Sequence, residues 1–171
     1  RTIGMDINSI KGLVPVERKL LTSGFDSLDT LEKNQLVSQI AKKEGKMYYE
    51  ITEDYILEYH KNLKIDVLRQ ICNDKIINGF TASNGHTYRT NRDDQLNMIG
   101  QKVELMADES ITTVSWKTED AGYIDHTREE WLQVYKEGYE HKETNLLKYN
   151  TLKQQVRDAK THDEVLAISW E

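Results

Sequence analysis

A doubly striped apolar pattern between residues 52 and 78 constrains the fold of this chain more than any other feature. One stripe recurs every three or four residues and consists of Ile56, Tyr59, Leu63, Val67 and Ile71. A second stripe runs beside it and consists of Ile65, Leu68, Cys72 and Ile76. This spacing predicts a long helix that is buried on more than one side. The spacing is not a strict heptad, so we favour packing on a partner helix, from this chain or another copy, over a regular coiled coil.

The signals at both ends of this segment also fit a helix. The Thr52 hydroxyl can cap the first turn, where Glu53 and Asp54 lie at the positive end of the helix dipole. The pair Asn78-Gly79 is a good stop signal. We therefore expect one uninterrupted helix between these signals.

The rest of the chain predicts further helices and two hairpins. Periodicity and caps favour helices at residues 27–45, 91–108 and 128–160, and a short one after residue 161. Turn dipeptides and alternation favour hairpins at residues 79–90 and 112–127. We also expect a short strand or extended segment at residues 46–51 and a short strand at residues 167–170. The expected fold class is α+β and helix-dominated, with long helices and two short β-hairpins that form a small antiparallel sheet.

The only plausible domain boundary falls near residues 45–52. Residues 1–51 are expected to form an N-terminal arm or attachment segment with one helix, and residues 1–25 to be largely irregular. Residues 52–171 are expected to form a helical stem followed by a hairpin-and-helix domain. The chain opens on Arg1 rather than Met, which is compatible with a missing or processed N-terminus.

Net charge, hydropathy and cysteine content argue against nucleic-acid binding, membrane insertion and an internal disulfide. The net charge is −6, which repels phosphate backbones, so we expect no nucleic-acid binding. No apolar run approaches the ~20 residues of a membrane span, so we expect no membrane insertion. Cys72 is the only cysteine, so it cannot form an internal disulfide, and its apolar neighbours predict a small buried side chain.

Two adjacent carboxylates open the helix expected at residues 91–108. Asp93 and Asp94 could bind a metal ion or form an acid pair, but adjacent helical side chains point about 100° apart and cannot easily share one ion. We favour a helix start capped by Thr90 or Asn91, with both carboxylates at the positive end. The apolar face of this helix, which we expect to meet the core, consists of Leu96, Ile99, Val103 and Met106.

Glu137 and His141 form the most metal-like pair, because they lie four residues apart on one helical face. A carboxylate-bridged site needs a matching pair on a second helix, and none occurs, so an exposed and solvated face is favoured. The chain also lacks zinc-peptidase, nucleophile-elbow and phosphate-loop motifs. We therefore expect no enzyme activity, no cofactor and no metal.

The aromatic residues allow two interpretations. Trp116, Tyr123, Trp131 and Trp170 could line a carbohydrate-binding face. Packing in a core or between subunits is favoured, because these residues alternate at strand spacing or lie on a helical stripe.

Three segments resemble one family when they are taken in order. They are "INGFTASNGHTYRTNRDDQLNMIG", "VSWKTEDAGYIDHTREEWLQV" and "LKYNTLKQQVRDAKTHDEVLAISW". The shared elements are a Gly-Phe step, a Tyr followed by "DDQxN", an isolated Trp before a turn, and a helix that ends before a final Trp. Over residues 64–171 the chain resembles an uncharacterised C-terminal domain family of bacteriophage and prophage tail-fibre and baseplate-associated proteins. The resemblance implies a tail role and supplies no catalytic residue.

From this resemblance we expect a structural component of a phage tail or phage-tail-like particle. It would act in the baseplate or tail-fibre region, in fibre attachment or host adsorption, by binding other tail, baseplate or fibre proteins. The expected interaction surface consists of Ile56, Tyr59, Leu63, Val67, Ile71, Trp116 and Tyr123. We expect a homo-oligomer, with a trimer as one form that such helices allow, and a host surface glycan as a further candidate partner. The alternative is a tail-fibre assembly chaperone that is absent from the mature particle.

Overall fold

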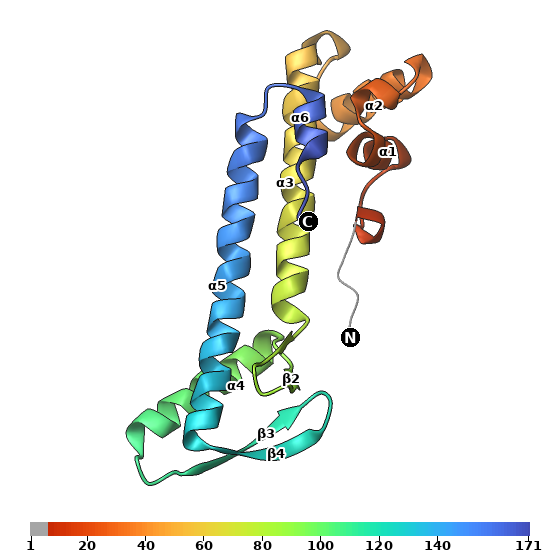
Figure 1. Cartoon of the computed structure of the whole chain (residues 1–171). Coiled ribbons are helices and arrows are strands. Elements are labelled where there is room, and N and C mark those ends of the chain that lie inside the picture. The colour runs from red at the N-terminus through yellow and green to blue at the C-terminus, as the bar shows by residue number, and fades with distance from the viewer. Residues whose placement is uncertain (1–6) are drawn as a thin grey trace. The chain divides into compact units, whose positions relative to one another are not determined.

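The computed structural model describes residues 7–171, and most of them are helical (Figure 1). The α-helices are α1 (Pro15–Ser23), α2 (Thr30–Glu44), α3 (Glu53–Ile77), α4 (Arg92–Ala107), α5 (Arg128–Asp158) and α6 (His162–Ala167). The short 3-10 helices are η1 (Ile7–Ser9), η2 (Phe25–Ser27) and η3 (Tyr48–Glu50). The strands are β1 (Phe80–Thr81), β2 (Thr87–Tyr88), β3 (Thr113–Thr118) and β4 (Gly122–Thr127).

The α+β, helix-dominated fold class is confirmed. Both predicted hairpins are present, β1 with β2 and β3 with β4, and both are antiparallel. In the described part of the chain they form two separate two-stranded sheets and not one shared sheet. None of the helices described in residues 7–171 has the length and apolar character needed to span a membrane.

The predicted long helix is confirmed as α3. The Thr52 hydroxyl accepts a hydrogen bond from the Tyr55 amide at 3.2 Å, as expected of a cap. Gly79 follows the helix with φ +84°, and a Cβ there would lie 2.6 Å from the Tyr88 carbonyl oxygen. Only glycine fits this position, because both the backbone angle and the close approach exclude a side chain.

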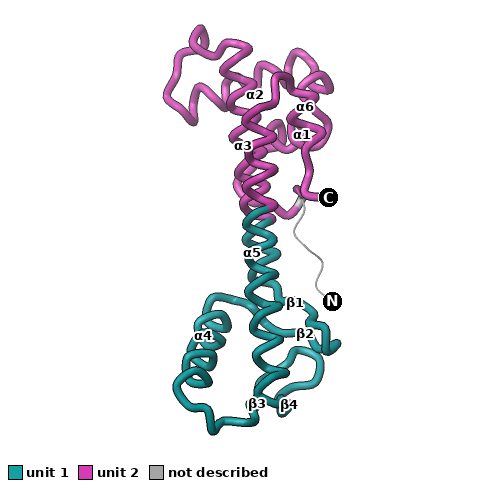
Figure 2. The backbone as a smooth tube through the Cα atoms, turned by 60° about the vertical axis from the view of Figure 1, so that its left-hand side comes forward, with its two compact units in different colours: residues 1–4, 72–147 teal, residues 5–71, 148–171 magenta. Residues whose placement is uncertain are grey.

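The chain divides into two compact units, which Figure 2 shows in two colours. Among the described residues, unit 1 comprises residues 72–147, and unit 2 comprises residues 7–71 and 148–171. Helices α3 and α5 each pass from one unit into the other, so this division differs from the boundary expected near residues 45–52. The attachment role of the N-terminal segment stays a prediction.

Residues 7–25 are more regular than we expected, and residues 1–6, which the expectation also covered, lie outside the described residues. Helix α1 starts with Pro15 in its first turn, where a proline has a preset φ and needs no amide partner. The buried Glu17 carboxylate accepts hydrogen bonds from the Tyr59 hydroxyl and from the Val14 amide at 3.1 Å. This contact docks α1 on α3 within unit 2.

No strand forms at residues 46–51 or at residues 167–170. The prediction of a strand at residues 167–170 was wrong, and at residues 46–51 Met47 has the extended backbone that we allowed as the alternative. In place of the strand at residues 46–51, η3 forms, and the Glu50 carboxylate accepts from the Met47 amide at 2.7 Å. In place of the strand at residues 167–170, the backbone meets side chains of α3. Lys64 Nζ donates to the Ile168 carbonyl at 2.7 Å, and burial lowers the pKa of Lys64 to about 8. An isolated strand has no ladder partner in either place, so local capping and side-chain donors satisfy the backbone instead.

A pair of histidines lies in unit 2. His60 Nδ1 lies 2.9 Å from His162 Nδ1, and the His162 ring stacks on Phe25 with centroids 4.4 Å apart. His60 is fully buried, and its Nε2 has no hydrogen-bond partner among the described residues. Burial lowers the pKa of His60 to about 3 and also lowers the pKa of His162. Both rings are therefore neutral in the folded chain at pH 7.

The stability of the chain should fall as the pH drops from 7 to 5. Burial holds the pKa of His60 near 3, well below the ordinary histidine pKa of about 6.5, so between these two values mainly the unfolded chain binds the proton. The expected loss is about 2 kcal/mol of unfolding free energy between pH 7 and pH 5. Urea unfolding at both pH values measures it.

The double variant His60→Leu and His162→Leu is the matched control, because it should lose most of this pH dependence. Carboxylates change the unfolding free energy mainly below about pH 4.5, so the change between pH 7 and pH 5 comes mainly from the histidines. An unchanged slope in the double variant would contradict the assignment.

Candidate protein-binding surface

The core of unit 1 gathers residues from α4, α5 and both hairpins. Its buried members are Ala82, Tyr88, Met98, Leu105, Val114, Trp131 and Val134. Trp131 on α5 is fully buried, and Trp116 on β3 meets it edge to face with ring centroids 5.2 Å apart. Helix α4 enters this cluster with only Met98 and Leu105, which lie seven residues apart on one side of the helix.

Polar contacts fix the rotation of α4 about its axis. The Arg128 guanidinium donates to the carbonyl oxygens of Leu105, of Asp108 at 3.2 Å and of Ile111 at 2.9 Å, at the C-terminal end of α4. Along its length, Lys102 Nζ lies 4.7 Å from the centre of the Tyr135 ring on α5. These contacts hold one side of α4 against α5, and Figure 2 shows the two helices side by side in unit 1.

The apolar face of α4 that we expected in the core lies on the outside, and this expectation was wrong. The four side chains have exposed fractions of 62% for Leu96, 49% for Ile99, 58% for Val103 and 70% for Met106. The reason is that α4 carries two apolar faces, and the core cluster takes the one with Met98 and Leu105. We call the four exposed residues the α4 stripe.

An apolar groove adjoins the α4 stripe. It has a volume of about 300 Å³ and lies between α4 and α5. Its apolar lining includes Met98, Ile99, Tyr135, Tyr139 and Leu146. Ile99 belongs to both features, so the α4 stripe and the groove form one continuous apolar surface on unit 1. The sequence did not predict the groove, because Tyr139 and Leu146 line a groove only when α4 lies beside them.

The expected interaction surface is distributed differently in the structure. Its five helix residues are buried inside unit 2, with exposed fractions of 8% or less: Ile56, Tyr59, Leu63, Val67 and Ile71. They therefore do not form a surface that the folded chain exposes. Trp116 is half-buried and Tyr123 is exposed, and both line a polar groove of about 610 Å³ together with Asn97 and Gln101. Binding of a host glycan there stays a prediction.

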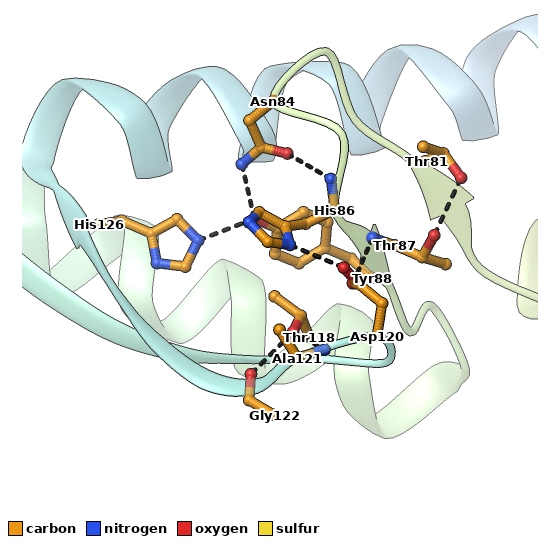
Figure 3. A network of polar contacts seen from close by, with 10 residues as sticks. All are labelled: Thr81, Asn84, His86, Thr87, Tyr88, Thr118, Asp120, Ala121, Gly122 and His126. Carbon is orange, nitrogen blue, oxygen red and sulfur yellow. Dashed lines mark hydrogen bonds and ion pairs between the residues drawn. The ribbon is translucent and has the colours of Figure 1, made fainter.

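A buried polar network joins the two hairpins (Figure 3). The Tyr88 hydroxyl accepts from Asn84 Nδ2 at 2.8 Å and lies 2.8 Å from His126 Nε2. His126 Nδ1 lies 3.2 Å from the Val114 carbonyl oxygen, which can only accept. The proton therefore sits on Nδ1, and the Tyr88 hydroxyl donates to Nε2. Burial raises the pKa of Tyr88, which keeps it a neutral donor.

An acidic side chain adds a second link between the hairpins. Asp120 accepts from the Thr87 amide at 2.9 Å and from His86 Nδ1 at 2.8 Å (Figure 3). The Thr87 amide first and His86 second hold the pKa of Asp120 below its usual range. Asp120 therefore acts as a structural acceptor.

Glu137 and His141 are structural links and not a metal pair or a merely solvated face. The Glu137 carboxylate accepts from the Ser83 amide and hydroxyl, both at 2.7 Å, which ties α5 to the first hairpin. His141 Nε2 donates to the Lys75 carbonyl at 2.9 Å, and its ring stacks on Phe80. No group of three or more metal-ligating side chains occurs in the part of the chain that the structure describes.

Asp93 and Asp94 lie at a helix start, as we favoured. Asn91 is the cap: its side chain accepts from the Asp94 amide at 2.9 Å, and the Asp94 carboxylate accepts from the Asn91 amide at 3.1 Å. Asp93 is exposed. Cys72 is buried as predicted, and burial raises the pKa of its thiol.

Replacing Tyr88 with Phe should destabilise unit 1 by about 1–3 kcal/mol, because the buried His126 Nε2 would lose its hydrogen-bond partner, whereas the exposed Asn84 can turn to water. Tyr123→Phe is the matched control, since that side chain is 73% exposed, and it should change stability by less than about 0.5 kcal/mol. Urea unfolding followed by tryptophan fluorescence measures both. Equal effects of the two variants would show that the network adds nothing.

A comparison with known protein families finds a match that covers most of the chain. A family model described as Domain of unknown function (DUF4376) matches residues 59–169, from the first half of α3 to beyond α6. No curated protein and no solved structure matches the chain. The link between this family and phage tails stays a prediction. With a family model matching well over half of its length, the chain belongs to the DUF4376 family.

Proposed function

We propose that this chain is a structural, protein-binding component of a phage tail or phage-tail-like particle. It would act in the baseplate or tail-fibre region and attach or present the fibre. The observation that carries the binding part of the proposal is the continuous apolar surface of unit 1, formed by the α4 stripe and the adjoining groove.

The apolar surface supports binding because it is large, contiguous and costly to leave in water. Four large apolar side chains of one helix are each about half exposed or more. Covering them would contribute on the order of 4 kcal/mol, taking about 1 kcal/mol for each half-buried side chain. Single exposed apolar residues need no explanation, whereas a stripe beside a groove is typical of an interaction site.

The polar groups of unit 1 support a structural role over chemistry. Tyr88 and His126 are buried and satisfy each other, so neither reaches a substrate. Glu137 and His141 are occupied by backbone and serine partners. A general acid or base has to reach the proton that it transfers, and these groups do not offer that geometry.

The tail context rests on the family resemblance of the quoted segments. Two of its elements have structural explanations here: the Gly79-Phe80 step follows α3, and the "DDQxN" segment begins α4. The second of these elements also contains Leu96, the first residue of the α4 stripe. The resemblance and the apolar surface therefore meet on one helix.

The second candidate is a tail-fibre assembly chaperone, and the same apolar surface favours it. A chaperone needs an exposed apolar face to hold a partner during folding, and it leaves the partner afterwards. The two functions differ in where the chain is found at the end of assembly.

Purified particles from the phage or prophage that encodes this chain decide between the two functions. We expect quantitative mass spectrometry to find the chain in particles at a fixed ratio to other tail proteins. Val103→Glu, which puts a charge on the α4 stripe, should lower its incorporation at least tenfold. Glu104→Gln is the matched control, because Glu104 is exposed on the same helix outside the stripe.

Absence of the wild-type chain from particles would overturn the structural role. If particle assembly still required the chain, the chaperone function would take its place. Equal incorporation of both variants would show that the α4 stripe is not the binding surface.

A further inference from the structure

The α4 stripe is symmetric along the helix. Its residues lie at positions 96, 99, 103 and 106, a spacing of three, four and three that follows a heptad seam. When such a helix meets a second copy in the opposite direction, Leu96 lies opposite Met106 and Ile99 lies opposite Val103. We propose that α4 pairs in antiparallel orientation with α4 of a second copy of this chain, an inference that rests on the proposed binding role of unit 1.

The charges at the two ends of the stripe select the orientation. Arg92 lies one turn before Leu96 on the same face of α4, whereas the neighbouring Asp93 points about 100° away from it. Asp108 and Glu109 directly follow the stripe, and all four of these charged residues are exposed. Within residues 7–171, neither Arg92 nor Glu109 takes part in an ion pair. An antiparallel pair brings Arg92 of each copy next to the two carboxylates of the other. A parallel pair would place like charges together, and the helix dipoles would also be aligned unfavourably.

A glycine beside the stripe supports close approach of a second helix. Gly100 lies inside α4, where glycine is a weaker helix former than alanine. A Cβ at Gly100 would have no neighbour within 4 Å, so nothing in the described chain requires glycine there. Gly138 on α5 differs, because a Cβ there would lie 3.1 Å from the Phe80 ring. Gly100 and Ala107 lie seven residues apart on one flank of the stripe. Because both residues are small, the backbone of a second helix can approach closely there.

The size of the surface sets the expected affinity. Helix α4 has 16 residues, so the pair would extend over roughly 24 Å. The burial of eight half-exposed side chains from two copies must outweigh the entropy lost on association, so a single pair should be weak in solution. Repeated copies in one particle would strengthen such a contact through their high local concentration.

Sedimentation of the full chain at concentrations from roughly 1 to 200 μM tests the pairing. We expect a monomer–dimer equilibrium in the wild type. Val103→Glu should weaken it at least tenfold, and Glu104→Gln should leave it unchanged. Circular dichroism and thermal unfolding of each variant would separate loss of pairing from loss of fold.

Charge reversal tests the orientation. Arg92→Glu and Glu109→Arg should each weaken the dimer, because each places like charges together in an antiparallel pair. The double variant should restore much of the affinity, because it exchanges the two signs. A double variant as weak as the singles would overturn the antiparallel arrangement.

Cross-linking tests the same register independently, in a Cys72→Ala background that removes the native thiol. In an antiparallel pair, Leu96 of one copy lies opposite Met106 of the other, while the two Leu96 positions are roughly 15 Å apart. A mixture of Leu96→Cys and Met106→Cys should therefore form a disulfide-linked dimer, and Leu96→Cys alone should not. Cross-linking of Leu96→Cys alone would show a parallel pair or trimer and overturn the proposal.

The outcomes separate this inference from the proposed function. If the chain stays monomeric at all concentrations but is present in particles, the proposed pairing is wrong and the proposed structural role stands. If the chain pairs through α4 but is absent from particles, the proposed pairing stands and the proposed tail role is wrong.

Discussion

The burial of Trp131 organises unit 1, because α4 and both hairpins contribute residues to the cluster around it. Trp131 lies in the first turn of α5, three residues after Arg128, whose guanidinium caps the carbonyl end of α4. One helical turn therefore provides both the apolar centre of the unit and the polar clamp on α4. The outward direction of the α4 stripe is a consequence of this arrangement and not of α4 alone.

Helix α4 shows where sequence reasoning succeeds and where it stops. Its existence and its start at Asn91 follow from local signals, since a cap and a periodic pattern act over a few residues. Its buried face could not be read in the same way. Leu96, Ile99, Val103 and Met106 outnumber Met98 and Leu105, yet the smaller set meets Trp131 because the contacts of Arg128 and Lys102 set the rotation. Periodicity identifies an apolar face but does not say which partner covers it.

The polar residues teach a related lesson about candidate sites. Glu137 and His141 have the spacing of metal ligands, and their real partners, Ser83 and Lys75, come from distant parts of the sequence. No local sequence pattern predicts that a distant backbone carbonyl will accept a hydrogen bond from a given side chain. The misassigned strand at residues 167–170 has the same origin, because Lys64 supplies a long-range donor to the Ile168 carbonyl. Local signals therefore predicted caps and turns well and long-range polar contacts poorly.

The connectivity of the two units has a consequence for how the chain is made. Among residues 7–171, unit 1 is one continuous segment, and unit 2 is assembled from the segments that precede and follow it in the sequence. During synthesis, unit 1 can complete its core as soon as residue 147 has emerged. Unit 2 has to wait for Val156, Val165 and Trp170, which are buried parts of its own core. The order of synthesis therefore favours unit 1 as the first part to fold, and unit 2 closes only after Trp170 has emerged.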